Sequence, residues 1–201
     1  AGANWLHASG NPWISDLKLS FLVIAPIEES LKFATVYLVF FRHKEFDEPI
    51  DGLIYAGTVA LGFASAENAY YVLRYGGDVI WTRSILAVPA HFLFAASYGH
   101  AMGMKKGGTD LVHKGQLIAS SSPSKNQVPH QPFPNRGPSL VQGLIIGIVA
   151  HGAYNAILFT GQRSGQTALA LSGLLGLLGF LVWRWRSFVR ELEKLSQYRT
   201  Y

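Results

Sequence analysis

The sequence predicts an all-α fold, a polytopic transmembrane helix bundle of about five spanning helices preceded by an interfacial segment, in one membrane-embedded domain over residues 1–201. Hydrophobic residues make up 49% of the chain, charged residues only 14%, and the mean hydropathy is +0.20, which is unusual for a soluble globular domain. Five windows are also apolar over roughly 20 residues, the length that a helix needs to cross the hydrocarbon layer.

The first 17 residues are expected to lie on the membrane surface. Trp5 and Trp13 are aromatic anchors of the interfacial kind, and Asn11-Pro12 is a helix-start signal. The chain opens on Ala1 without a signal-peptide pattern, so we expect it to be truncated at the N-terminus, with helices missing before Ala1. The five apolar windows follow at residues 18–42, 51–73, 84–104, 139–160 and 166–186.

Two polar stretches complete the chain and set its expected orientation. Residues 105–138 are rich in proline and serine, show no helical period and are predicted to form a flexible loop. Residues 187–201 form a basic tail. Twelve Lys and Arg residues fall on the side of the membrane that holds this loop and tail, against four on the other side. The excess of cations predicts that the loop and the C-terminus are cytoplasmic.

Charge and cysteine content exclude several partners. The net charge of +5 does not predict a nucleic-acid partner, because the cations sit at the edges of apolar runs and instead indicate topology. Membrane lipid is the expected surrounding. Cysteine is absent, which excludes a disulfide-linked partner, a zinc ribbon and a cysteine nucleophile.

Ionisable side chains inside transmembrane helices are expensive and are therefore functional candidates. Apart from His100, which lies nearer the cytoplasmic end, the glutamates, histidines and Asn155 fall roughly 8 to 17 Å from the non-cytoplasmic end of each helix, given a rise of about 1.5 Å per residue. Small residues four apart would let the helices approach closely, as at Gly99 and Gly103 or Gly143 and Gly147. The polar groups are expected to converge on one site: Glu28, Glu29, Lys32, Glu67, Asn68, His91, His151 and Asn155.

Two adjacent glutamates beside a lysine suit acid–base chemistry. Lys32 is four residues from Glu28 and three from Glu29, so it can neutralise one carboxylate and leave the other to react. A carboxylate tuned in this way can act as a general base, while histidine and amide groups can stabilise an oxyanion. These parts fit hydrolysis of a carbonyl compound, with Lys32 and Asn68 in supporting roles and the following as catalytic candidates: Glu28, Glu29, Glu67, His91, His151 and Asn155.

A metal ion is the alternative means of activating water. A divalent metal such as zinc would take its ligands from Glu29, Glu67, His91 and His151. The helical HExxH signature is missing, so local spacing does not indicate a metal site and no cofactor is assigned from the sequence.

Four ordered motifs resemble those of the PrsW family of intramembrane proteases, which belongs with the CAAX-prenyl proteases and bacteriocin-processing enzymes. Residues 28–32 read EESLK (EExxK), residues 63–68 read FASAEN (FxxxEN), His91 stands in the third window, and residues 151–155 read HGAYN (HxxxN). The resemblance covers about residues 21–160. Four motifs on four helices are far more specific than any one of them.

The resemblance implies a glutamic-type peptidase of the prokaryotic cytoplasmic membrane that cuts single-pass membrane proteins or membrane-proximal peptides, with regulated cleavage of an anti-sigma factor as the best-known role. It implies that Glu28 or Glu29 activates water, that His91 and Glu67 assist, and that His151 and Asn155 hold the oxyanion. A metal-dependent version of the enzyme stays open.

Two other functions also stay open. The superfamily resemblance extends to a gamma-secretase subunit without its own peptidase activity, which favours a membrane scaffold or substrate-binding subunit as the runner-up. A proton-coupled transporter would also carry glutamate and histidine inside its helices, but the chain shows no repeated halves. For Glu28, Glu29 and Lys32 the simplest structural alternative is a buried ion pair that fixes helix packing.

Overall fold

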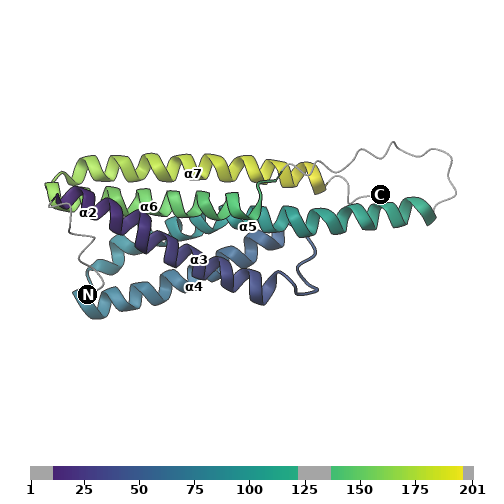
Figure 1. The fold of residues 1–201 in the computed structure, drawn as a ribbon, viewed down its shortest axis with the longest axis horizontal. Helices are drawn as coiled ribbons and strands as arrows, with labels where there is room; N and C mark the ends of the chain where they lie inside the picture. The colour runs from purple at the N-terminus through teal and green to yellow at the C-terminus, as the bar shows by residue number, and fades with distance from the viewer. Residues whose placement is uncertain (1–10, 122–136, 197–201) are drawn as a thin grey trace.

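The computed structural model describes residues 11–121 and 137–196. Every regular element in this part of the chain is helical, and the helices run along one long axis (Figure 1). The all-α prediction is confirmed. Residues 1–10 of the predicted interfacial segment, residues 122–136 of the predicted loop and residues 197–201 of the basic tail lie outside the described residues.

The first helical run extends from Pro12 to Phe40 in four segments: α2 (Pro12–Lys18), the π-helical η1 (Leu19–Ile24), α3 (Ala25–Thr35) and the π-helical η2 (Val36–Phe40). It begins where the sequence predicts, since Asn11 Oδ1 accepts a hydrogen bond from the Trp13 N–H at 3.0 Å and Pro12 takes the first helical position. π-Helical turns are often found at functional sites. Both adjacent glutamates lie in α3, between two such segments.

Four longer helices complete the fold: α4 (Pro49–Tyr75), α5 (Val79–Ser121), α6 (Leu140–Ser164) and α7 (Thr167–Ser196). α5 packs against α4, α6 and α7, and α3 packs against α6, α4 and α5. The turn from α6 to α7 passes through Gly165, whose φ of +69° favours glycine. An ion pair joins the first run to the end of α6, because Arg163 donates to both carboxylate oxygens of Asp16, at 2.7 and 2.8 Å.

Four helices in the described part of the chain are long and apolar enough to cross a membrane: α4, residues 79–106 of α5, α6, and residues 167–190 of α7. They confirm four of the five predicted windows. The first window is not among them, because π-helical segments divide its helix and three charged residues occupy its middle. Large apolar side chains such as Leu73 and Trp81 are 88% and 75% exposed, as expected of a surface that meets lipid.

The predicted loop over residues 105–138 is wrong for residues 105–121, which continue α5 as a helix. No proline occurs between Pro89 and Pro123, so no residue in that interval is unable to continue a helix. Gly107 and Gly108 each lower helix propensity by about 1 kcal/mol relative to alanine, and this is too little to end a helix by itself.

Small residues bring the helix backbones together along the helix faces that also carry the polar groups. Gly52 of α4 faces Gly99 of α5, and a Cβ added at Gly103 of α5 would overlap the carbonyl oxygen of Pro49. A Cβ at Gly143 of α6 would lie 2.8 Å from the Ser97 carbonyl oxygen of α5. The predicted small-residue faces of the third and fourth windows are therefore contact faces, and they fix α5 against both neighbours.

We expect Gly103→Ala to lower the free energy of unfolding by about 1–3 kcal/mol, because the added methyl group would push α4 away from α5. Gly62→Ala in α4 is the matched control: a Cβ there meets nothing within 4 Å, so the variant should be unchanged or up to about 1 kcal/mol more stable. Unfolding in mixed detergent micelles measures both variants. Equal stability of the two would contradict the close contact between α4 and α5.

Candidate functional site

A buried polar cluster forms where α3, α4, α5 and α6 meet. α3 contributes two glutamates and a lysine, α4 one glutamate, and α5 and α6 one histidine each: Glu28, Glu29, Lys32, Glu67, His91 and His151. The structure thus brings together six of the eight side chains proposed from the sequence, which come from segments up to 123 residues apart in the chain.

Glu29 is the most deeply buried carboxylate of the cluster, and all its contacts are donors. Its Oε1 accepts from the Lys32 ammonium at 2.7 Å and from His151 Nδ1 at 2.8 Å, and its Oε2 accepts from the Tyr98 hydroxyl at 3.3 Å. The side chain of Glu29 is fully buried, as is that of Lys32. Since an isolated charge is very costly in such a place, each of the two charges requires the other.

Lys32 lies at the centre of the cluster. Besides Glu29, its ammonium is 2.8 Å from His91 Nδ1, 4.5 Å from the centroid of the Phe63 ring and 3.8 Å from Glu28 Oε2. An ammonium group can only donate, so His91 Nδ1 accepts this hydrogen bond. The other ring nitrogen, Nε2, then carries the proton and donates to Glu67 Oε2 at 2.9 Å.

His151 is oriented by Glu29. Because a carboxylate only accepts, His151 Nδ1 carries the proton of their hydrogen bond, and in the neutral ring Nε2 keeps its lone pair. This Nε2 faces Glu28 Oε2 at 3.8 Å. The ring is held by packing as well, since it stacks on Phe94 at 5.0 Å and meets the His91 ring edge-on at 5.2 Å.

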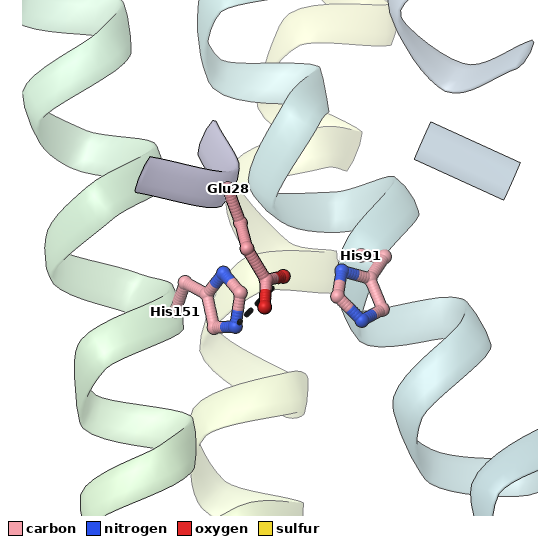
Figure 2. Close-up of side chains that lie close together, drawn as sticks. All are labelled: Glu28, His91 and His151. Atoms are coloured by element: carbon pink, nitrogen blue, oxygen red, sulfur yellow. Dashed lines mark ion pairs between the residues drawn. The ribbon is translucent and has the colours of Figure 1, made fainter. Parts of the chain in front are cut away.

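Glu28 differs from Glu29 in having a buried oxygen without a hydrogen-bond partner, Oε2. Figure 2 shows its carboxylate pointing between the rings of His91 and His151. Ligand atoms of these three residues lie within 4.8 Å of one another. Two imidazoles and one carboxylate form the donor set of many catalytic zinc sites, so the residue types fit a divalent metal, although His91 Nδ1 would have to exchange the Lys32 ammonium for the ion. A buried acceptor that lacks a donor is also the kind of atom that a cation or a water would satisfy.

This group differs from the metal ligands expected from the sequence, which were Glu29, Glu67, His91 and His151. Glu28 stands in place of Glu29, whose two oxygens accept hydrogen bonds from Lys32, His151 and Tyr98. Glu67 is engaged on the other side of His91, where it pairs with an arginine.

Two residues of the cluster were not singled out from the sequence. Arg83 of α5 lies 2.8 Å from Glu67 Oε2 through Nη2 and donates from Nε to Asn68 Oδ1 at 2.7 Å, which connects the predicted supporting amide to the site. Because Arg83 lies at the edge of an apolar window, it counts in the sequence among the cations that indicate membrane orientation. Tyr98 is seven residues after His91 and therefore on the same helix face, a periodicity that could have identified it.

Asn155 does not join the cluster. It lies one turn beyond His151 on α6 and is half-buried, and the described residues contain no hydrogen-bond partner for its amide. The amide therefore has no contact here that would assign it the oxyanion role. His100 also stays apart, with its ring 3.9 Å from that of Phe188.

Comparison with known sequences agrees with this geometry. The sequence model of the PrsW family of intramembrane metalloproteases matches residues 2–185. The chain is 41% identical over 87 residues to Protease PrsW of Geobacillus kaustophilus, covering 43% of this chain and 39% of that protein. It is 26% identical over 179 residues to Protease PrsW of Shouchella clausii, covering 89% of this chain and 68% of that protein.

A third relative, Protease PrsW of Bacillus subtilis, is 28% identical over 176 residues, which cover 88% of this chain and 66% of the relative. The match to the Geobacillus kaustophilus protein spans less than half of that relative's length. No solved structure matches the chain at a significant level. Because the family model covers nearly the whole sequence, the chain belongs to the PrsW family of intramembrane metalloproteases.

Proposed function

We propose that the chain is an intramembrane endopeptidase that hydrolyses peptide bonds of membrane-associated proteins. Family membership supports this activity, and so does a buried cluster of glutamates and histidines between helices able to span a membrane. One observation carries the mechanism: Glu28 Oε2 faces His151 Nε2 at 3.8 Å and has no hydrogen-bond partner, and with a neutral His151 ring both atoms are acceptors. Two facing acceptors form a binding position for a molecule that donates a hydrogen bond to both, such as a water.

Glu28 and Glu29 have different roles in this mechanism. Glu29 is a positioning residue, since Lys32 neutralises it and it holds the Nδ1–H of His151. Glu28 is the general base: its carboxylate takes a proton from the water bound between Glu28 and His151 while the water oxygen attacks the peptide carbonyl carbon. The proton then passes from Glu28 to the amide nitrogen as the C–N bond breaks, which returns the carboxylate and releases an amine and an acid.

A divalent metal such as zinc is a second way to activate the same water, and the family's description favours it. Glu28, His91 and His151 would hold the ion, which when bound polarises water and the substrate carbonyl. Glu29 would then keep its role, because a carboxylate that accepts the second N–H of a histidine orients the ring toward the site.

The substrate class follows from the setting of the cluster. Its part-exposed carboxylates are Glu28 on α3 and Glu67 on α4, with 18% and 21% of their side chains exposed. A peptide would therefore approach along these two helices. We assign as substrates single-pass membrane proteins or membrane-proximal segments, with an anti-sigma factor as the specific candidate from the family resemblance.

The location proposed for the enzyme is the cytoplasmic membrane of a bacterium, in agreement with the bacterial origin of the relatives. The segment between α5 and α6 and the C-terminus would face the cytoplasm, because twelve of the Lys and Arg residues lie on that side against four on the other.

We expect Glu28→Gln to slow cleavage at least about 100-fold, because an amide cannot take the proton of the water. Thermal unfolding should be nearly unchanged, since Glu28 Oε2 makes no hydrogen bond that the amide would lose. Turnover is measured on single-span test peptides reconstituted with the chain in liposomes, with products identified by mass spectrometry.

Glu45→Gln is the matched control, because Glu45 is 65% exposed and forms a surface pair with Lys44 in the turn between η2 and α4. It should cleave at the wild-type rate. Wild-type turnover by Glu28→Gln would contradict the role of Glu28. A wild-type chain that binds the peptides without cutting them would favour the scaffold, and proton movement into sealed vesicles would favour the transporter.

Metal removal separates the two mechanisms. If the metal mechanism operates, a chelator should abolish cleavage and zinc should restore it, and elemental analysis of the purified protein should find about one metal ion per chain. His151→Ala should lose both the metal and the activity. Full activity in a chelated protein that contains no metal would exclude the metal mechanism and leave the water activated by Glu28 alone.

A further inference from the structure

Arg83 lies at the edge of the cluster and contacts three residues of α4. Its Nη2 lies 2.8 Å from Glu67 Oε2, its Nε donates to Asn68 Oδ1 at 2.7 Å, and its guanidinium carbon is 3.8 Å from the centroid of the Tyr71 ring. Only 16% of the Arg83 side chain is exposed. A long cationic side chain with three such neighbours is fixed in one position, as the planar guanidinium fork allows.

The contacts of Arg83 repeat an arrangement found elsewhere in the cluster. Lys32 holds Glu29, and Glu29 holds the imidazole of His151. Arg83 fixes Glu67 by an ion pair, without a hydrogen bond from Nη2, and Glu67 accepts the Nε2–H of His91 at 2.9 Å. Each histidine that faces Glu28 is thus oriented by a carboxylate that a cation fixes in turn, the fully buried Lys32 in one case and the part-buried Arg83 in the other.

The two cations approach the rings from different sides. Lys32 also contacts His91 directly, at Nδ1, whereas Arg83 acts on this ring only through Glu67. Without Arg83 the Glu67 carboxylate would lose its ion pair and keep only the hydrogen bond with His91 Nε2, and it would be free to turn toward solvent because a fifth of its side chain is exposed. The orientation of His91 would then depend on Lys32 alone.

We propose that Arg83 is a positioning residue for the reaction: it fixes the Glu67 carboxylate against His91 Nε2 and thereby sets the orientation of the imidazole that faces Glu28. The role rests on the proposed peptidase function for its catalytic consequence. The structural part of the role concerns one hydrogen bond and can be measured without turnover.

The test compares Arg83→Ala and Arg83→Lys with Arg74→Ala in liposomes. Arg74 is the control, because it is an exposed arginine of α4 beside a tyrosine ring, 5.9 Å from the centroid of Tyr75. We expect Arg83→Ala to lower kcat roughly 10- to 100-fold with little change in KM, since the supporting shell of a site affects chemistry more than substrate binding. Guanidine added to Arg83→Ala should restore part of the rate, and Arg74→Ala should match the wild type.

A second readout is the NMR signal of the His91 Nε2–H proton in the nitrogen-15-labelled chain, identified by its loss in His91→Gln. The wild type and Arg74→Ala should show this proton protected from exchange with water, and Arg83→Ala should lose the protection. Arg83→Lys should lie between, because a lysine keeps the charge but not the fork that joins Glu67 to Asn68.

The outcomes separate this role from the peptidase assignment. If the wild type cuts nothing but Arg83→Ala loses the protected proton, the peptidase function fails and the positioning of His91 by Arg83 stands. If Arg83→Ala keeps both the protected proton and the wild-type kcat, the role of Arg83 is refuted. Should Arg83→Ala fail to fold, Arg83→Lys decides: unchanged values in both readouts would overturn the proposal, and intermediate values would support it.

Discussion

The site depends on one buried ion pair, between Glu29 and Lys32 of α3. Neither charge is stable inside the bundle alone, and their mutual contact at 2.7 Å fixes both side chains at the point where three further helices meet. Glu29 then orients His151, and Lys32 contacts His91, so a single pair organises both imidazoles. Because Lys32 is 2.7 Å from Glu29 and 3.8 Å from Glu28, one of the two adjacent carboxylates is neutralised and the other is left with an unpartnered oxygen.

Close helix packing turns this pair into a site. The hydrogen bond between His91 and Glu67 joins α5 to α4, and its length is set by how closely those two helices approach. Glycine fixes the same two helices about 18 Å farther along, where Gly103 lies against the backbone of α4 with no space for a side chain. The same reasoning applies to α6, where the face of Gly143 meets the backbone of α5 and brings His151 toward Glu29. Small residues in these helices therefore serve the position of the polar groups as well as packing.

Much of this arrangement could be predicted from the sequence, because hydropathy, helical rise and residue spacing depend only on which residues follow one another in the chain. They gave the four spans and a common depth for the polar groups. Three features could not be predicted, because they depend on how far a side chain extends or on the absence of a residue that terminates a helix. Lys32 can reach a glutamate three or four residues away, so only the fold decides that Glu29 is its partner. Arg83 extends from a window edge into the cluster. α5 continues to Ser121 because the sequence contains no residue that ends it sooner.

The most direct test of the account is a double-mutant cycle on the central pair, using Glu29→Gln, Lys32→Met and the variant with both changes, with equilibrium unfolding measured in mixed micelles. Each single change should lower the free energy of unfolding by about 3–5 kcal/mol, because it leaves the other charge buried and unpaired. The double variant should lose less than the two single losses together, and about as much as one of them or less. Strictly additive losses would show that the two residues stabilise the bundle independently, and would contradict the claim that their pairing organises the site.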